Sequence, residues 1–478
     1  MKKFNHKKIT RLAACIFAAT TAFVSCGGEK APVQKGDWKL VWQDEFNGNK
    51  LDLTKWDYQT GTGSQYGLNG WGNDELQYYT PDNVSVKKGN LVIEARKEDK
   101  NGMAYTSGRI RSMKDDGTIL YAPTFGRVEA RMMLPKGDGI WPAFWMLPAT
   151  DKYGVWASSG EIDIMEAKGR LPNRTYGTVH FGQPWPGNKY TGGMYKFPEG
   201  DMTTYHVYAL EWEPGSLKWF VDDNIFYETN NWYAMDASGE KVWDYPAPYD
   251  EPFYILFNLA VGGTYDEYRK PSAKEIPAQM LVDWVRVYAK NSYNMNVTRP
   301  IPERDDKAIE TYANDNGNYI LDAGFKKINK DGLKDAPTER FTSHLWYCLA
   351  LTDFNGDASA SVEDNACHVK IKNAGTENYS VQVVQNMGIA KGYTYLIEFD
   401  AKAEQEREIA VKISGDEDSG WVVHSSEYHP KLETEYKHFK YRFTMENSSD
   451  PTARLEFNCG LSDADVWIKN VSIKTAEF

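Results

Sequence analysis

The chain has 478 residues, which exceeds the usual size of one domain, so at least two folded units are expected. Hydrophobic residues make up 41% and charged residues 26%, the balance of a soluble protein with enough apolar material for a core. The net charge is −12 and no basic stripe is present, which argues against nucleic acid as a partner because phosphate binding depends on clustered Lys and Arg side chains.

Residues 1–26 have the pattern of an export signal. A basic segment precedes an apolar run, Leu12 to Val24, which is too short to span a bilayer. The run ends at Cys26 in a sequence that resembles a bacterial lipoprotein cleavage box, in which the cysteine becomes lipidated. We therefore expect an exported outer-membrane lipoprotein, at the cell surface or in the periplasm, that touches the membrane only through its lipid anchor. An ordinary signal peptide with an incidental cysteine is the alternative.

From residue 38 to residue 290 the sequence is typical of short β-strands separated by turns. Segments such as Leu91–Arg96, Arg127–Met132 and Lys218–Asp222 are alternating or continuously apolar, and the Asp-Asp-Asn sequence at 222–224 favours a turn. Long amphipathic helical periodicity is absent. The pattern predicts an all-β unit, a large sandwich or barrel.

The most informative segment is Ser159–Glu166, with the sequence Ser-Gly-Glu-Ile-Asp-Ile-Met-Glu. Because side chains alternate along a strand, Glu161 and Asp163 share one face and the isoleucines occupy the other. Glu166 would fall on the wrong face of a regular strand, and one β-bulge near Met165 returns it to the face of Glu161. Three acidic side chains on one face predict a wet cleft. A solvent-exposed acidic strand face is the alternative.

Two carboxyl groups on one strand suit retaining glycoside hydrolysis, which needs them about 5–5.5 Å apart. Glu161 would attack the anomeric carbon and Glu166 would protonate the leaving oxygen, with the pKa of Glu166 raised by the nearby negative charge. Asp163, between them, is expected to hydrogen-bond Glu161 and to help set its ionisation. The 16 Trp, 30 Tyr and 20 Phe residues agree with a sugar substrate, because the C–H faces of pyranose rings pack on aromatic rings.

Residues 291–312 interrupt the strand pattern with prolines and charges and are typical of a linker. Strand-like segments return beyond it, for example Tyr379–Val384 and Tyr395–Phe399, and predict a second, smaller β-sandwich over residues 313–478. Three cysteines in this part allow one disulfide with one thiol left over, or three buried thiols: Cys348, Cys367 and Cys459. The sequence does not choose among these arrangements.

Several ordered motifs in the first unit resemble glycoside hydrolase family 16, and within it the laminarinase-like endo-β-1,3-glucanases. Besides the bulged catalytic segment, they are Gly70–Thr80, Phe125–Arg131, Gly139–Leu147, Thr178–Gly182, Phe257–Gly263 and Met280–Tyr288. The resemblance implies a concanavalin-like β-jelly-roll sandwich with a long concave cleft and retention of configuration. By matched position it supports Glu161 as nucleophile, Glu166 as acid/base and Asp163 as the assisting carboxylate.

The resemblance also implies further substrate-binding residues. Three tryptophans and a histidine are expected to line the cleft, an asparagine and an arginine to contact sugar hydroxyls, and a last tryptophan to close the far end: Trp141, Trp145, Trp156, His180, Asn73, Arg109 and Trp232. A core position is the alternative for each cleft tryptophan, and a structural role is the alternative for His180.

A metal site away from the cleft is a further implication. Many members of the family bind a structural calcium ion, and Glu45, Gly89 and Asp283 lie at matching positions. Oxygen ligands from separate segments suit Ca²⁺. Catalysis itself is expected to need no metal or other cofactor.

Two segments depart from the family pattern. The segment before the catalytic strand, Trp156–Gly160, has alanine where the family often has proline. The loop Tyr265–Ile276 is unusually charged, with Asp266, Glu267, Arg269 and Lys270. We expect these differences to affect the fine specificity for substrate and to leave the chemistry intact.

Residues 313–478 resemble the family 4/9-type carbohydrate-binding modules. The motifs are Asp322–Phe325, Tyr379–Gln385, Gly392–Tyr395, Phe399–Ala403 and Trp467–Ile473. The resemblance implies that this unit binds glycan and raises the local enzyme concentration on a polymer. Trp346, Trp421 and Tyr428 are the candidate stacking residues. A spacer domain with buried aromatics is the alternative.

The sequence therefore predicts a monomeric, endo-acting β-1,3-glucanase whose partner is β-glucan, with mixed β-1,3/1,4-glucan as a further substrate. One alternative is a family 16 hydrolase of another glycan, a lichenase or an algal galactanase, and the acidic charge disfavours sulfated galactans. The other is a non-catalytic glycan-binding lipoprotein. The intact set of Glu161, Asp163 and Glu166 argues against it, because a lectin gains nothing from paired acids.

Overall fold

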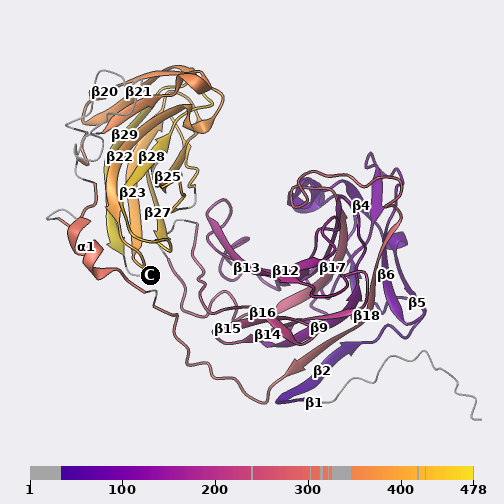
Figure 1. The fold of residues 1–478 in the computed structure, drawn as a ribbon. Helices are drawn as coiled ribbons and strands as arrows, with labels where there is room; N and C mark the ends of the chain where they lie inside the picture. Colours follow the sequence, from indigo (N-terminus) through magenta and orange to yellow (C-terminus); the bar gives the residue numbers. More distant parts are fainter. Residues whose placement is uncertain are drawn as a thin grey trace, which may run out of the picture.

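The computed structural model describes residues 34–237, 239, 241–301, 303–312, 316–320, 322–325, 346–416, 419–425 and 427–476. The predicted export signal and Cys26 lie outside these ranges. Figure 1 shows two β-rich units joined by an extended segment, which confirms the all-β prediction. Within the described ranges, no helix is long and apolar enough to cross a membrane.

The first unit is a curved sandwich of two sheets. The nine-stranded sheet has the order β1-β2-β18-β9-β14-β15-β16, with β6 beside β18 and β5 beside β6. Its strands are β1 (Gln34–Lys35), β2 (Trp38–Asp44), β5 (Val84–Lys87), β6 (Asn90–Ala95), β9 (Gly126–Met133), β14 (His206–Glu213), β15 (Ser216–Val221), β16 (Asn224–Thr229) and β18 (Ala278–Ala289).

The seven-stranded sheet has the order β13-β12-β11-β10-β17-β8-β3, and we call it the cleft sheet. Its strands are β3 (Asp57–Tyr58), β8 (Arg109–Arg111), β10 (Ile140–Pro148), β11 (Glu161–Glu166), β12 (Arg174–Gly182), β13 (Asn188–Lys196) and β17 (Phe253–Val261). A short parallel pair is formed by β4 (Gln77–Tyr79) and β7 (Tyr105–Ser107). Single 3₁₀ turns occur at η1 (Ser64–Tyr66), η2 (Asn69–Gly72), η3 (Pro81–Asn83), η4 (Thr352–Phe354) and η5 (Asn378–Ser380).

The facing sides of the two sheets enclose one hydrophobic core. Alternate residues of each strand point into it, as Ile162 and Ile164 of β11 do, which is the period of two expected of a strand. Trp56, Trp212 and Trp219 are fully buried in this core. The opposite side of the cleft sheet therefore carries the polar residues of β11, and Figure 1 shows this side as the concave one.

β11 carries the predicted bulge. Along the pairing with β10, the register shifts between Met165 and Asp163. Along the pairing with β12, it shifts between Asp163 and Glu166. The extra residue returns Glu166 to the face that carries Glu161, so the prediction from the sequence spacing is confirmed.

The predicted linker at 291–312 packs against both units. Its first part lies on the first unit, where the ring of Tyr293 is 5.3 Å from the ring of Phe125. Its second part forms α1 (Asp306–Tyr312), which contacts β22 of the second unit. The sequence shows no helical period here, and a local hydrogen bond begins the helix: the Asp305 carboxylate accepts from the backbone N–H of Ala308 at 3.1 Å.

The second unit is a smaller sandwich with its own core. One sheet has the order β19-β22-β28-β25 and the other β20-β21-β29-β23-β27. The strands are β19 (Tyr347–Ala350), β20 (Gly356–Glu363), β21 (Ala366–Ala374), β22 (Val381–Ile389), β23 (Thr394–Ala403), β25 (Ala410–Ser414), β27 (Lys437–Thr444), β28 (Asp450–Asn458) and β29 (Val466–Ala476), with the pair β24 (Arg407–Glu408) and β26 (Lys431–Leu432) at one side. Three free thiols are buried in this core: Cys348, Cys367 and Cys459. Of the two arrangements that the sequence allows, the structure therefore has three buried thiols and no disulfide among them.

Candidate active site

The three predicted catalytic acids lie together on the concave side of the cleft sheet. β11 is a central strand, with β10 on one side and β12 on the other. The side chain of Glu161 is 17% exposed and that of Asp163 is 4% exposed, while Glu166 is half-buried. The two glutamates are thus open to a ligand, and the aspartate between them is enclosed.

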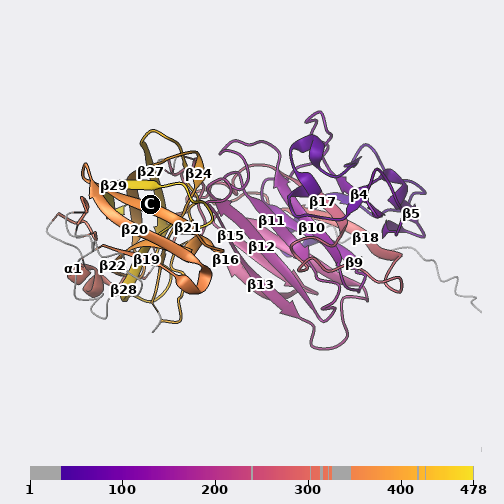
Figure 2. The ribbon, with the colours of Figure 1, turned by 90° about the horizontal axis from the view of Figure 1, so that it is seen from above.

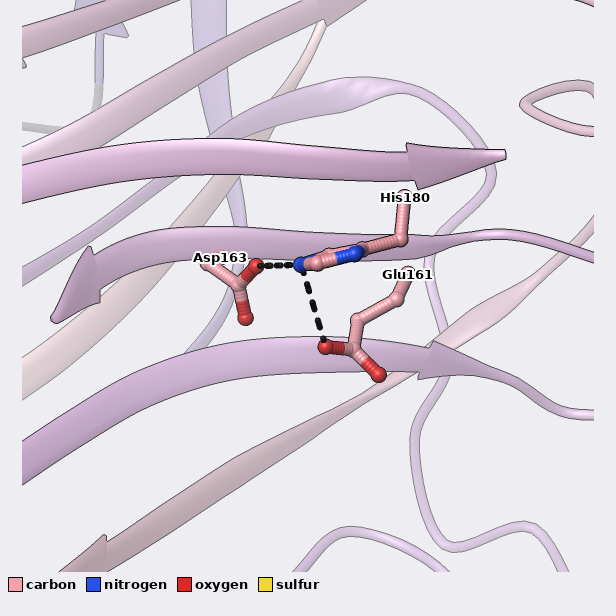
Figure 3. Close-up of side chains that lie close together, drawn as sticks. All are labelled: Glu161, Asp163 and His180. Carbon is pink, nitrogen blue, oxygen red and sulfur yellow. Dashed lines mark ion pairs between the residues drawn. The ribbon is translucent and has the colours of Figure 1, made fainter. Parts of the chain in front are cut away.

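β12 places His180 against these acids because Glu161 and His180 are direct cross-strand partners. The Nε2 atom of His180 lies 3.4 Å from Oδ2 of Asp163 and 3.9 Å from Oε1 of Glu161. Figure 3 shows the imidazole edge directed at both carboxylates. The histidine predicted for the cleft therefore belongs to the acid cluster, and its positive charge offsets part of the negative charge there.

Each glutamate has its own indole donor. Nε1 of Trp141 donates to Oε1 of Glu166 at 2.9 Å, and Nε1 of Trp156 donates to Oε2 of Glu161 at 2.9 Å. Trp156 is 38% exposed, whereas Trp141 is buried. Two of the three predicted cleft tryptophans thus touch the catalytic carboxylates directly and hold them in separate orientations.

Burial and mutual charge set the ionisation of the cluster. Burial, followed by the charge of Asp163, raises the pKa of Glu161 to about 7. The same two causes raise the pKa of Glu166 well above its usual range. Burial lowers the pKa of His180, but the close contact with Asp163 and the charges of the neighbouring carboxylates outweigh it and raise that pKa to about 9. A glutamic acid that keeps its proton near neutral pH is what a general acid requires.

The end of the cleft beside β8 holds a cation between two indoles. The guanidinium carbon of Arg109 lies 4.3 Å from the ring centroid of Trp71 and 4.8 Å from that of Trp145. Its Nε donates to Oε1 of Gln59 at 2.6 Å. Arg109 is itself buried, so its first role here is to fix Trp145, the third predicted cleft tryptophan.

A buried carboxylate near this end was missed by sequence reasoning. Glu75 is fully enclosed and accepts hydrogen bonds from Asn73 (3.3 Å), Gln77 (2.6 Å) and the Tyr79 hydroxyl (3.1 Å). Burial raises the pKa of Glu75, and the positive charge of Arg109 opposes that rise. Asn73, predicted to bind hydroxyls, is thus engaged by Glu75. The sequence signal that could have revealed this site is an acidic residue, Glu75, among the polar residues of Gly70–Thr80.

The charged loop after β17 has a structural role next to Glu166. Asp266 is fully buried, pairs with Arg170 at 2.8 Å and accepts from the backbone N–H of Gly139 at 2.8 Å. This buried anchor fixes the neighbouring Tyr265, whose ring stacks on Trp141 with centroids 4.6 Å apart. The loop therefore supports the indole that donates to the acid/base, which the sequence did not reveal.

Trp232 does not line the cleft, and the prediction that it closes the far end is wrong. Its side chain has no exposed surface and belongs to the core of the first unit. The indole N–H donates to the carbonyl of Pro246 at 2.9 Å, and the ring stacks on Tyr245. An aromatic residue close to a turn offers no local sign of which neighbours will cover it.

The predicted calcium ligands are engaged by arginines. Both carboxylate oxygens of Glu45 accept from Arg286, at 2.8 and 2.9 Å, and Asp283 accepts from Arg131 at 2.6 Å. Gly89 lies in the turn between β5 and β6. The carboxylates of Glu45 and Asp283 are thus paired with arginines, and Gly89 can offer a ligand only through its backbone carbonyl. The calcium site stays a prediction, which chelation followed by thermal denaturation would test.

Of the three candidate stacking residues in the second unit, Trp421 alone is open. Trp346 is fully buried in the core, and Tyr428 is half-buried with its ring 4.8 Å from that of Tyr441. Trp421 is 51% exposed and lies over the guanidinium of Arg454, 5.0 Å from its carbon.

The sheet surface next to Trp421 is polar and buried. Nε2 of Gln382 donates to Oδ1 of Asn458 at 2.6 Å, and Glu456 pairs with Arg454 at 3.3 Å. Nε of Arg454 and Nδ2 of Asn458 have no hydrogen-bond partner in the described part of the chain. Buried donors without a partner are costly, and these two lie beneath the surface, out of reach of a ligand.

Comparison with known proteins places the cleft residues in a family context. Residues 72–286 match glycosyl hydrolases family 16, and residues 346–465 match a carbohydrate binding domain. Over 284 residues, covering 55% of this chain and 40% of the relative, the chain is 49% identical to the glucan endo-1,3-beta-glucosidase A1 of Niallia circulans. Over 296 residues, covering 59% of this chain and 96% of the relative, it is 39% identical to the beta-glucanase of Rhodothermus marinus. The solved laminarinase of Rhodothermus marinus is 41% identical, with 53% of this chain and 98% of that chain covered and a TM-score of 0.46.

The extent of these matches differs between the relatives. The chain spans less than half the length of the Niallia circulans protein and nearly the whole of the Rhodothermus marinus protein. The segment 72–286 contains β10, β11 and β12, and with them all the residues of the acid cluster.

Proposed function

Since this chain belongs to glycosyl hydrolases family 16, we propose that it is an endo-acting, retaining hydrolase of β-1,3-glucosidic bonds in β-glucans such as laminarin. Mixed β-1,3/1,4-glucan is the further substrate of the proposal. The observation that carries it is the bulged strand β11, which presents Glu161 and Glu166 on one face with a separate indole donor for each.

In the first step the Glu161 carboxylate attacks the anomeric carbon of the sugar bound over β11. The bond to the glycosidic oxygen breaks, and Glu166 gives its proton to that oxygen, so the leaving chain departs with a new hydroxyl. In the second step Glu166, now a carboxylate, takes a proton from water while the water oxygen attacks the same carbon and releases Glu161. Two inversions at one carbon retain its configuration.

The environments of the two glutamates support these roles. Glu161 is the glutamate that lies near the imidazole of His180, and positive charge there favours a carboxylate nucleophile. Burial and the charge of Asp163 raise the pKa of Glu166, which favours its protonated form before the bond is cut. When the glycosyl-enzyme forms, the charge on Glu161 disappears, and the pKa of Glu166 falls, which suits its second role as a base.

The test is hydrolysis of laminarin, mixed-linkage glucan and agarose by purified protein. We expect rapid loss of viscosity and short products from laminarin, with the β-anomer formed first in a proton NMR time course. Glu161→Gln should lose all activity. Its matched partner Glu166→Gln should keep cleaving aryl glycosides, whose leaving groups need no proton. An initial α-anomer, or undiminished hydrolysis by Glu161→Gln, would contradict the mechanism.

The second unit is proposed to bind the same polymer through the surface beside Trp421. The exposed indole of Trp421, which can stack on the apolar face of a sugar ring, supports this role. Retention of the protein on insoluble β-glucan, with Trp421→Ala as the comparison, tests this role. A spacer function predicts equal retention of both.

A lipid anchor at Cys26 is proposed on the sequence alone, and it would place the enzyme at the outer membrane, facing the cell surface or the periplasm. Metabolic labelling with a fatty acid should mark the unmodified protein and leave Cys26→Ala unlabelled. Absence of label on both proteins would favour an ordinary cleaved signal, and label on both would place the lipid at a residue other than Cys26.

A further inference from the structure

The edge strand β13 presents its side chains alternately to the core and to the cleft. Thr191 bonds the Tyr227 hydroxyl, and Tyr195 packs 5.8 Å from Phe226, so this set faces the nine-stranded sheet. The alternate set must face the other way. It consists of Tyr190, Gly192 and Met194, and we call it the β13 platform.

Register ties this platform to the active site. Tyr190 is the direct cross-strand partner of His180, and their ring centroids are 5.7 Å apart. Since His180 contacts Asp163 in the cleft, Tyr190 stands on the same open surface. β13 lies two strands from β11, about 10 Å at the usual strand spacing. A glycan that crosses the strands over Glu161 and Glu166 reaches β13 beyond the reacting ring.

The platform is apolar and open. Tyr190 is 72% exposed and Met194 is 46% exposed. A side chain at Gly192 would bring its Cβ within 2.4 Å of the Gly177 carbonyl oxygen, so glycine keeps the surface between them low. Exposed apolar side chains gathered on one surface beside an active site indicate a binding surface, whereas isolated ones need no explanation.

The second unit stands at the same end of the cleft without covering the platform. Gln183, Gly187 and Lys189, which precede or begin β13, line a narrow gap together with Tyr428 and other residues of the second unit. Figure 2 shows β13 at the edge of the cleft sheet, beside β12. The exposed fractions of Tyr190 and Met194 hold with both units present, so the platform lies open between the catalytic cluster and the second unit.

We propose that Tyr190, Gly192 and Met194 form a further glycan subsite, which binds sugar rings of a neutral glucan chain beyond the bond that is cut. The phenol ring and the thioether pack against the C–H faces of the sugars, and the low surface at Gly192 admits a ring between them. The inference rests on the proposed function. It makes the enzyme prefer chains long enough to cross from β11 to β13.

The test compares long and short substrates. In Tyr190→Ala with Met194→Ala, the ratio of kcat/KM on laminarin to kcat/KM on the shortest oligosaccharide that is cleaved should fall about tenfold, the loss of one aromatic contact. Tyr190→Trp in the otherwise unmodified protein should keep the original ratio, because a flat ring is still present at this position. Ile225→Ala is the matched control, since Ile225 is 51% exposed on β16 of the other sheet.

A binding measurement separates this inference from the proposed function. In the Glu161→Gln background, calorimetry with β-1,3-glucan oligosaccharides of increasing length should show affinity that rises with length. When Tyr190→Ala and Met194→Ala are added, the affinity should stop rising at a shorter oligosaccharide. Unchanged length dependence with intact hydrolysis would overturn the platform alone. If the unmodified protein neither cleaves nor binds any β-glucan, the proposed function and the platform fall together.

Discussion

Replacing Trp141 with phenylalanine should move one limb of the pH–activity profile and leave the other in place. The indole N–H of Trp141 donates to Oε1 of Glu166 at 2.9 Å and lowers the pKa of that carboxyl. Phenylalanine keeps a ring against Tyr265, with which the indole stacks at 4.6 Å, so the loop after β17 retains its support. The variant removes the donor alone, and the pKa of Glu166 should rise.

The size of the rise follows from the burial of the pair. A hydrogen bond to a charged group is worth about 1.5–3 kcal/mol, which corresponds to about 1–2 pKa units. Trp141 is buried, so water does not replace the lost donor. Trp156, the donor to Glu161, is 38% exposed, and water would replace part of its contribution. Trp156→Phe should therefore raise the pKa of Glu161 by less than about 1 unit.

The assay is the pH dependence of kcat/KM on laminarin, which reports the free enzyme. Activity needs a proton on Glu166, so Trp141→Phe should shift the alkaline limb to higher pH. Activity also needs ionised Glu161, so Trp156→Phe should shift the acidic limb to higher pH. Circular dichroism checks that both variants fold. If the two variants move the same limb, the pair titrates as one unit and the assignment of a separate donor to each glutamate is refuted.

Three further outcomes are expected. Because the pKa of His180 is raised to about 9, the stability that this residue contributes is complete below pH 6.5 and is lost as pH rises through about 9. In denaturant titrations, His180→Gln should lower the free energy of unfolding by about 3 kcal/mol at pH 6 and by little above pH 10. A difference between the two proteins that stays constant with pH would contradict this. Asp266→Asn should lower stability by about 2 kcal/mol and reduce kcat/KM, because Arg170 loses its buried partner and Tyr265 its anchor; lost stability with unchanged kcat/KM would show that the loop does not position Trp141. Trp421→Ala should reduce retention on insoluble β-glucan about tenfold, with hydrolysis of short soluble oligosaccharides as the internal reference.

The acid cluster could be predicted because it depends on the order of residues along one strand. The alternation of β11 and the five-residue step from Glu161 to Glu166 require a bulge if both glutamates are to share a face, and the bulge is present. The isoleucines between them mark the core side in the same way. These conclusions depend on neighbours along one strand, which the amino-acid order states directly.

Contacts between segments far apart in the chain depended on tertiary structure. The stack of Tyr265 on Trp141 and the pairing of Asp266 with Arg170 each join separate segments. Charge in the loop after β17 suggested a change in specificity, but it could not show that Asp266 is fully buried.

The sequence by itself determined the all-β class, the face of β11 that carries the acids and the bulge that aligns them. Only the folded structure decided that Trp232 lies in the core, that Trp421 is exposed and that Tyr190 lies beside His180. Because side chains alternate along a strand, the sequence shows which side of the strand each residue occupies. What covers that side is decided by strands and loops distant in sequence, because burial and cross-strand register depend on how the whole sheet packs.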